Sequence, residues 1–193
     1  MPMLRACRYI SGWTSLLCNG KIICLEMPVY KRQLTPENAL ARCAALCSRS
    51  EQAEYDIRTK LRGWGIGDAD SDKIVSRLVE GKYLDEERYA RAFVRDKFRF
   101  GGWGRLKIAY ALRQKHVAAD VIDEAMNEIE PEDYESTLEK LMQSKYRMVK
   151  LREKMKAKAA LMRFAIQRGF EPDMVARMAG RLIADCDDSC EEM

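Results

Sequence analysis

Basic side chains alternate with aromatic rings between positions 95 and 115, and this segment has the clearest capacity for chemistry. Seven Lys or Arg residues stand there against the single acid Asp96, around the rings of Phe98, Phe100 and Trp103. Cations attract phosphates and rings stack on bases, so the mixture favours contact with nucleic acid. Packing of the three rings in a hydrophobic core is the alternative. The residues expected to contact DNA or an acidic surface are Arg95, Lys97, Arg99, Trp103, Arg105, Lys107, Arg113 and Lys115.

A second basic segment lies between positions 145 and 168, where nine Lys or Arg residues face one acid, Glu153. Residues four apart share a helix face, so one cationic row is expected from Lys150, Lys154 and Lys158, and Arg163 and Arg168 join it as candidate contacts. The same helix is expected to dock on the protein through an apolar stripe made of Leu151, Met155, Ala159, Met162 and Ile166. Alternatively, the charge only solubilises the helix or balances the acidic block 120–139.

Groups that react near neutral pH are scarce, so no catalytic, cofactor-binding or metal site is expected. The only histidine, His116, occupies a position that an internal repeat already explains. The glycine cluster 101–104 lacks the Gly-Lys-Ser/Thr of a phosphate loop and more simply breaks a helix. The acidic run 68–72 lacks the glycine and glutamate of a calcium loop, and no two cysteine pairs have zinc-ligand spacing. An enzyme is therefore the least expected class.

A short phrase recurs three times at the ends of basic or polar helices. Its copies are Arg62–Ile66, Arg113–Val117 and Ile166–Phe170, and their last residues are 51 and 53 positions apart. A period near 50 predicts tandem modules that stack because each is too small to bury its own apolar face. Apolar residues at helical spacing predict three helices in each module. The expected fold class is all-α, with three tandem three-helix repeats at 34–83, 84–131 and 132–193.

Capping residues predict where several helices begin and end. Thr35 and Pro36 suit the start of the first helix, and Ser48 with Glu51 forms a capping box for the second. His116 stands where the other two copies of the recurring phrase have glycine. Histidine adopts the left-handed backbone of a helix end at some cost, so a less tightly turned cap is expected there.

Residues 1–33 precede the repeats and match neither their pattern nor a clear helix. Lys21–Glu26 could form a short strand or a clamp on the first repeat, or the segment could be a poorly ordered lead-in or translation from an early start codon. An odd count of seven cysteines without a secretory signal favours a reducing compartment, with Cys43 and Cys47 as free thiols one helical turn apart. No apolar run approaches the roughly 18 residues of a membrane span. A cytoplasmic protein without membrane contact is expected.

Three separated phrases resemble the RecX family of bacterial recombination regulators. They are Tyr83–Phe93, then Gly102–Gly104 followed by Lys107, Ile108 and Leu112, and finally Arg168–Phe170. Residues 48–61 resemble the opening of the family pattern, and the resemblance runs from about residue 36 to residue 185. The chain departs from the pattern at His116, where the family usually has glycine, and in the leader 1–33.

The resemblance implies a curved rod of three tandem three-helix units that lies in the groove of a RecA filament. It also implies a non-enzymatic monomer that binds RecA or the RecA–single-stranded DNA filament, without a cofactor. By inhibiting or modulating recombinase and ATPase activity, such a protein regulates DNA repair, homologous recombination and the SOS response. Direct binding of single-stranded DNA remains open. A helical nucleic-acid-binding protein that acts independently of RecA is the alternative, and an unrelated helical scaffold is a third class.

Overall fold

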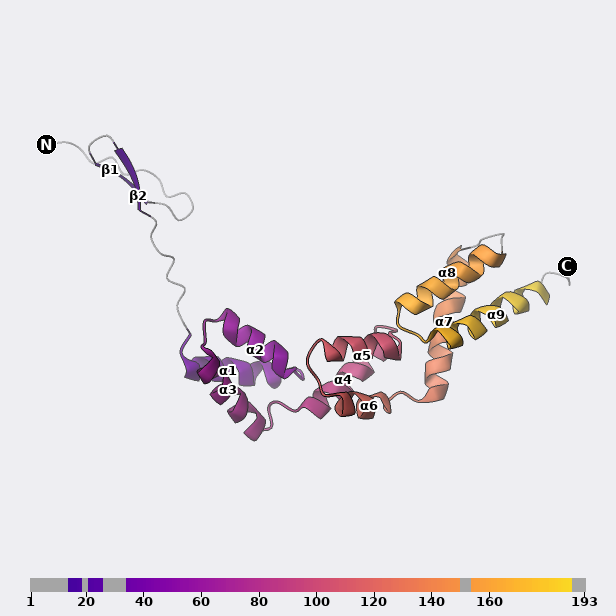
Figure 1. Cartoon of the computed structure of the whole chain (residues 1–193), viewed down its shortest axis with the longest axis horizontal. Coiled ribbons are helices and arrows are strands. Elements are labelled where there is room, and N and C mark those ends of the chain that lie inside the picture. The colour runs from indigo at the N-terminus through magenta and orange to yellow at the C-terminus, as the bar shows by residue number, and fades with distance from the viewer. Residues whose placement is uncertain (1–13, 19–20, 26–33, 150–153, 189–193) are drawn as a thin grey trace. The chain divides into compact units, whose positions relative to one another are not determined.

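The computed structural model describes residues 14–18, 21–25, 34–149 and 154–188, and the chain divides into two compact units, 1–34 and 35–193 (Figure 1). In the first unit, strands β1 (Thr14–Cys18) and β2 (Lys21–Leu25) pair antiparallel, with Thr14 opposite Leu25. Of the alternatives left open for the leader, a short strand at 21–25 is the one observed. Its partner strand is not among the elements predicted from the sequence.

The second unit is all-helical over its described residues, which confirms the predicted fold class of tandem three-helix repeats for that unit. Within each group of three, the helices pack on one another (Figure 1). Among the residues that the structure describes, no helix has the length and apolar character of a membrane span. The limits 34–83, 84–131 and 132–193 of the repeats stay predictions. In chain order the helices are α1 (Pro36–Cys47), α2 (Glu54–Gly63), α3 (Asp68–Glu80), α4 (Glu86–Arg99), α5 (Arg105–Arg113), α6 (Ala119–Met126), α7 (Pro131–Val149), α8 (Lys154–Gln167) and α9 (Pro172–Asp188).

Side-chain caps explain only some of the helix starts. The Thr35 hydroxyl accepts a backbone N–H in the first turn of α1, which confirms the cap predicted there. The capping box predicted at 48–51 is wrong, because α2 begins only after Ala53. Ala53 is buried in the hydrophobic core, so burial rather than a side-chain bond holds the start of α2. Glu51 instead accepts a hydrogen bond of 2.6 Å from Arg88 of α4.

The three copies of the recurring phrase end α2, α5 and α8 with the same turn. The last residue of each phrase donates its backbone N–H to the carbonyl five residues earlier, at 3.1, 3.3 and 3.2 Å. The residue before it has a positive φ in every copy: 81° at Gly65, 59° at His116 and 87° at Gly169. The looser cap predicted at His116 is therefore wrong.

His116 keeps the left-handed backbone because its neighbours hold it there. A non-glycine residue in this conformation costs about 1–2 kcal/mol. The imidazole of His116 packs on the ring of Tyr55, with centroids 5.0 Å apart, and the following Val117 is buried. These contacts offset the backbone cost, which a prediction based on one residue's conformational preference does not include.

A continuous hydrophobic core joins the second and third repeats. At its centre the buried ring of Tyr134 lies 5.9 Å from the ring of Phe98 and 5.1 Å from that of Phe170. Apolar residues of the last helical segment of each of these repeats also enter this core. They are Ile122, Ala125, Ile129, Val175, Met178, Ala179 and Leu182.

The second and third repeats meet where two glycines bring their backbones into contact, an arrangement we call the glycine joint (Gly104 and Gly169). Gly104 donates its N–H to the carbonyl of Arg168 at 2.8 Å, and Leu106 donates to the carbonyl of Gly169 at 3.1 Å. A Cβ atom on Gly104 would overlap the Gly169 carbonyl, and one on Gly169 would overlap Lys107. Gly104 and Gly169, which are 65 residues apart in the sequence, therefore form the two sides of one joint.

Substitution of Gly169 by alanine tests the joint. Gly169→Ala is expected to lower the free energy of unfolding by about 2–4 kcal/mol, because a Cβ there overlaps Lys107 and makes the left-handed backbone unfavourable. Gly63→Ala is the matched control, since a Cβ at that helical position meets nothing within 4 Å. It should leave stability unchanged or raise it slightly. Urea unfolding followed by circular dichroism measures both variants, and equal stability of the two would contradict the joint.

Candidate binding surface

Trp103 is half-buried between α4 and α5, with a cation of each helix beside its ring. The Nζ atom of Lys97 lies 5.3 Å from the ring centroid and that of Lys107 lies 4.3 Å from it. Of the other two rings in this segment, Phe98 is buried in the core, whereas Phe100 is 87% exposed. Core packing therefore accounts for Phe98 and in part for Trp103, but not for Phe100.

Arg105 is held by the polar contacts beside the glycine joint. Its backbone N–H donates to the hydroxyl of Tyr134 at 3.0 Å, and its guanidinium lies 4.5 Å from the centroid of that ring. The guanidinium also donates to the Ile129 carbonyl at 3.0 Å, while its Nε is buried without a hydrogen-bond partner among the described residues. The Tyr134 hydroxyl in turn donates to Glu171 at 2.7 Å. Burial and the bond to Glu171 raise the pKa of Tyr134, so it stays a neutral donor.

Two further candidate cations also make contacts between repeats. The Arg168 guanidinium donates to the Gly101 carbonyl at 3.1 Å and lies 4.8 Å from the ring centroid of Phe164. Lys115, at the end of the second repeat's α5, forms an ion pair with Asp56 of α2. These interactions direct both side chains toward the protein itself.

The remaining arginines of the candidate set point to solvent. Arg95, Arg99, Arg113 and Arg163 are exposed. Over the residues that the structure describes, none of the four has an ion pair with a carboxylate. Exposed cations without an ion pair are available to an anionic partner, because binding that partner breaks no ion pair within the protein.

The helix of the second basic segment turns a different face inward from the one predicted. Lys150 and Leu151 lie outside the described residues, and α8 begins at Lys154. Lys158 is half-buried beside the core face. Of the apolar stripe predicted to dock on the protein, Met162 packs against the core, but Met155 is 77% exposed and Ile166 is 43% exposed, so the predicted docking face is wrong. The face that enters the core is instead made of Ala157, Leu161 and Ala165.

Two exposed apolar residues of α5 are not among the predicted contacts. Leu106 is 53% exposed and Tyr110 is 63% exposed, on the face opposite the buried Ile108 and Leu112. Their spacing of four residues, out of phase with the buried pair, is the sequence signal that identifies them.

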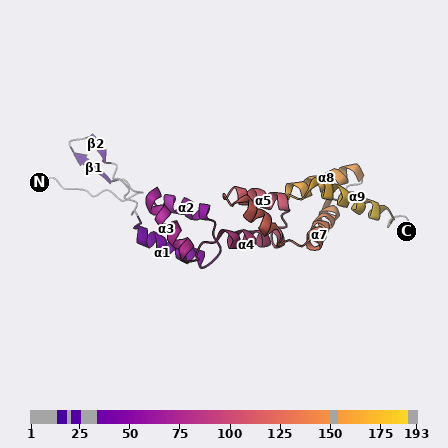
Figure 2. The same cartoon turned by 60° about the horizontal axis from the view of Figure 1, so that its bottom comes forward.

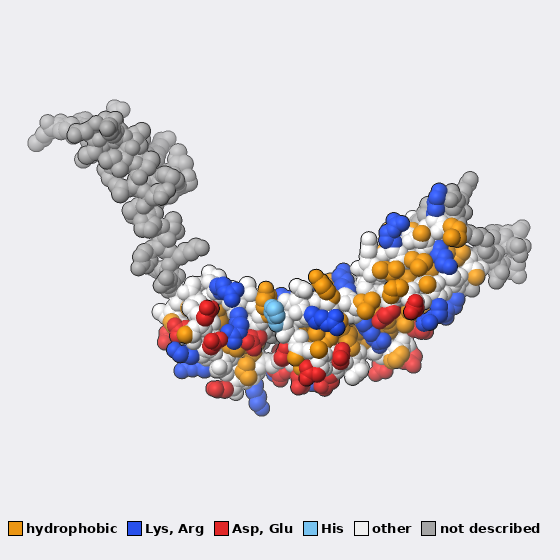
Figure 3. Space-filling view, in the orientation of Figure 1, with side chains coloured by type: hydrophobic (Ala, Val, Ile, Leu, Met, Phe, Trp, Pro, Cys, Tyr) orange, Lys and Arg blue, Asp and Glu red, His pale blue; other side chains and the backbone are white. Residues whose placement is uncertain are grey.

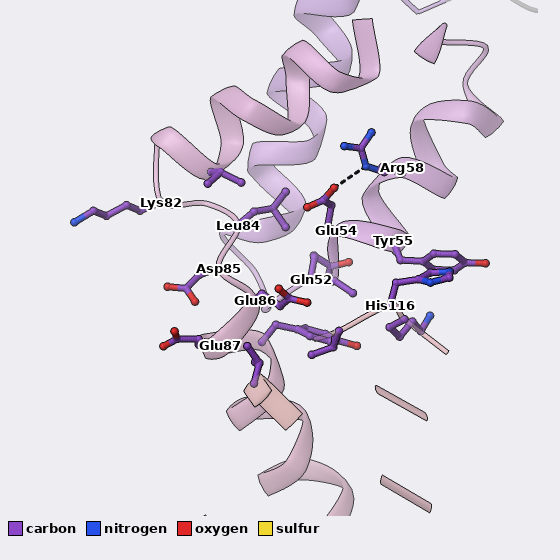
Figure 4. A pocket seen from close by; sticks show the side chains of 16 residues that line it. Gln52, Glu54, Tyr55, Arg58, Lys82, Leu84, Asp85, Glu86, Glu87 and His116 are labelled. Atoms are coloured by element: carbon purple, nitrogen blue, oxygen red, sulfur yellow. Dashed lines mark hydrogen bonds and ion pairs between the residues drawn. The ribbon is translucent and has the colours of Figure 1, made fainter. Parts of the chain in front are cut away.

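A cleft of about 880 Å³ lies between the first and second repeats (Figure 4). The rings of Tyr55 and His116 lie together on one side of it. Most of its charged groups have structural partners: Glu54 binds Arg58 at 2.7 Å, and a Glu86 carboxylate oxygen accepts the Ala118 N–H at 3.1 Å. Because these groups are held by their own neighbours, the cleft is not arranged as a set of convergent reactive groups.

The two described thiols are also poorly suited to chemistry. Cys43 and Cys47 of α1 are free and buried, as predicted for thiols one helical turn apart. Burial, together with the neighbouring Cys47, raises the pKa of Cys43 to about 11, and burial raises the pKa of Cys47. A thiol with a raised pKa carries little thiolate at neutral pH and is a weak nucleophile.

Comparison with known proteins finds similarity to one family along most of the chain. Residues 85–126 match a family model described as RecX, second three-helix domain. The chain is 32% identical over 146 residues to Regulatory protein RecX of Vibrio parahaemolyticus serotype O3:K6 (strain RIMD 2210633), covering 76% of this chain and 92% of that protein. It is 29% identical over 157 residues to Regulatory protein RecX of Clostridium perfringens (strain 13 / Type A), covering 78% of this chain and 73% of that protein.

Two solved structures share the fold. A crystal structure of regulatory protein RecX superposes with a TM-score of 0.68 at 22% identity, over 74% of this chain and 72% of that one. The crystal structure of RecX from Lactobacillus salivarius superposes with a TM-score of 0.67 at 14% identity, over 76% of this chain and 96% of that one.

Arginine substitutions test the division between structural and free cations. Arg105→Ala is expected to lower the free energy of unfolding by about 1–2 kcal/mol, because it removes the bond to Ile129 and the contact with the Tyr134 ring. Arg113→Ala, at an exposed position, should change it by less than about 0.5 kcal/mol. Both are measured by urea unfolding. A loss at Arg113 as large as that at Arg105 would contradict the division.

Alkylation tests the state of the buried thiols. In the native protein at pH 8, Cys43 and Cys47 are expected to resist iodoacetamide, because burial blocks access and the raised pKa of Cys43 keeps it protonated. Both should react fully in urea. Mass spectrometry of proteolytic peptides locates the modified cysteines, and native-state labelling of Cys43 as fast as in urea would disprove the prediction.

Proposed function

Because this chain belongs to the RecX family of regulatory proteins, we propose that it binds RecA, or the filament that RecA forms on single-stranded DNA, and inhibits its recombinase and ATPase activities. In this role it regulates DNA repair and recombination in the cytoplasm as a non-enzymatic protein. The relatives are named only as regulatory proteins, so the partner and the mode of regulation belong to the proposal.

The observation that carries the proposal is the set of exposed arginines that form no ion pair with a carboxylate within the described part of the chain. Arg95, Arg99, Arg113 and Arg163 are spread over the second and third repeats, on α4, α5 and α8. We add Lys97, Lys107 and the row Lys150, Lys154 and Lys158 to the proposed contacts. Arg105, Lys115 and Arg168 support the surface from within, through their contacts with Tyr134, Asp56 and Gly101.

Tandem repeats suit a regulator that acts by binding alone. A series of small modules offers several separate contact areas, and a filament offers a series of identical protomers. Once one repeat is bound, the next binds at a high effective concentration, so weak contacts sum to a stable complex. Such a complex changes filament growth or ATP turnover by favouring one state of the polymer, without a reaction of its own.

A direct role on nucleic acid is the second candidate function. The position of Trp103 between Lys97 and Lys107, with the exposed ring of Phe100 nearby in sequence, suits stacking on bases beside a phosphate backbone. In that case the protein would bind single-stranded DNA tightly by itself and act without RecA.

The rate of ATP hydrolysis by RecA on single-stranded DNA tests the proposed function. Substoichiometric amounts of this protein are expected to lower that rate several-fold, because one bound molecule affects many protomers of a filament. A variant with Arg99→Glu, Arg113→Glu and Arg163→Glu should need at least ten times more protein for the same inhibition. Wild-type inhibition should also weaken as salt rises.

The matched control reverses three exposed arginines of the first repeat. Arg49→Glu, Arg62→Glu and Arg77→Glu change the net charge by the same amount and are expected to leave inhibition within about two-fold of wild type. An equal loss of inhibition in both triple variants would show that inhibition depends on net charge and not on the position of the arginines. An unchanged ATPase rate, with nanomolar binding of labelled single strands in the absence of RecA, would favour the second candidate function.

A further inference from the structure

An exposed apolar stripe runs along α8 on the side away from the core. At 100° per residue, Met155, Ala159, Met162 and Ile166 share one face, which is centred about 130° around the helix from the buried Ala157, Leu161 and Ala165. Met155 and Ala159 are exposed, Ile166 is 43% exposed and Met162 is half-buried. Met162 packs against the core, so the exposed row consists of Met155, Ala159 and Ile166. Single exposed apolar residues are common on protein surfaces, but a row of them at helical spacing is typical of an interaction site.

Beyond the glycine joint, α5 also exposes apolar side chains, Leu106 and Tyr110. The end of α8 and the start of α5 meet where Leu106 donates its backbone N–H to the Gly169 carbonyl at 3.1 Å. Figures 1 and 2 show the two helices end to end, and Figure 3 shows hydrophobic side chains gathered over the third repeat. The name α8–α5 stripe is used below for the exposed apolar residues of both helices, Met155, Ala159, Ile166, Leu106 and Tyr110.

Cations stand along the edges of the stripe. On the helical wheel Lys158 lies on one side of the α8 row and Arg163 on the other, and Arg113 follows Leu106 and Tyr110 on the outer face of α5. In the described part of the chain, none of the three pairs with a carboxylate. An apolar centre with cationic edges fits a partner that has an apolar centre and acidic edges.

The chemistry of the stripe favours a protein segment over DNA or a second copy of this chain. Bases stack on aromatic rings, whereas the α8 part of the stripe is aliphatic and includes a methionine, which adapts to protein side chains. A second copy would place Lys158 and Arg163 against identical cations, and like charges repel. From Met155 to Ile166 the stripe is about 16 Å long, which matches about three turns of a helix.

We infer that the α8–α5 stripe is a docking surface for an acidic amphipathic helix of the filament protein. The inference rests on the proposed function and deepens it by assigning the surface and the partner segment. The apolar face of that helix packs on Met155, Ala159 and Ile166, and its carboxylates pair with Lys158, Arg163 and Arg113.

Aspartate substitutions in the stripe test the inference. The variant Met155→Asp/Ile166→Asp is expected to bind RecA filaments, assembled on oligo(dT) with a slowly hydrolysed ATP analogue, at least ten times more weakly than wild type. Both positions are exposed, so the fold should be unchanged by circular dichroism and melting temperature. The control Val79→Asp/Tyr83→Asp replaces two apolar residues of the first repeat that are 50% and 43% exposed, and it should bind within about two-fold of wild type.

The outcomes separate the two levels of the proposal. If wild-type protein does not bind filaments, the proposed function is wrong. If wild type binds and the stripe variant binds equally well, only the stripe is wrong. A photo-crosslinker at position 155 makes the partner explicit: a crosslink to an acidic helical segment of RecA supports the inference. A crosslink to the oligonucleotide, to a second copy of this chain or to a non-acidic segment of RecA overturns it.

Discussion

The contact between the backbones of Gly104 and Gly169 determines how the second and third repeats meet. The end of α8 leaves carbonyls without helical partners, and the start of α5 leaves N–H groups without them. At the joint these groups satisfy one another, because Gly104 and Leu106 donate to Arg168 and Gly169. The two helix ends reach hydrogen-bonding distance only because neither glycine carries a side chain. Opposite ends of two helix dipoles are also brought together, which is favourable.

The side chains around the joint divide into those that hold it and those that remain available. Arg105 and Arg168 are engaged with Tyr134, Ile129 and Gly101, so their charge is used inside the protein. The joint also brings the end of α8 to the start of α5, so the exposed apolar residues of the two helices, with Arg113 and Arg163 beside them, lie on either side of it. In this account the same two glycines that fix the fold also create the surface proposed to bind the filament.

The repeat, the helices and the core stripes could be predicted from the sequence, because the periodicity of apolar residues and the spacing of the recurring phrases reflect local structure. The sequence-based predictions that are wrong concern features that depend on contacts between residues distant in the sequence. His116 adopts the turn of a glycine because Tyr55 packs on its ring, and the start of α2 is held by burial of Ala53. The inward face of α8 is mispredicted because a helical pattern does not say which of two apolar faces turns inward, and the buried face is made of Leu161 with two alanines.

We propose that this chain regulates a filament by lying against its protein subunits, through a surface organised around the glycine joint. Cryo-electron microscopy of RecA filaments on single-stranded DNA with this protein bound tests that claim most directly. The account predicts density for the repeats along the filament, with α8 and α5 facing a RecA helix. Density that touches only the DNA strand, or filaments that carry no bound protein at saturating concentration, would contradict it.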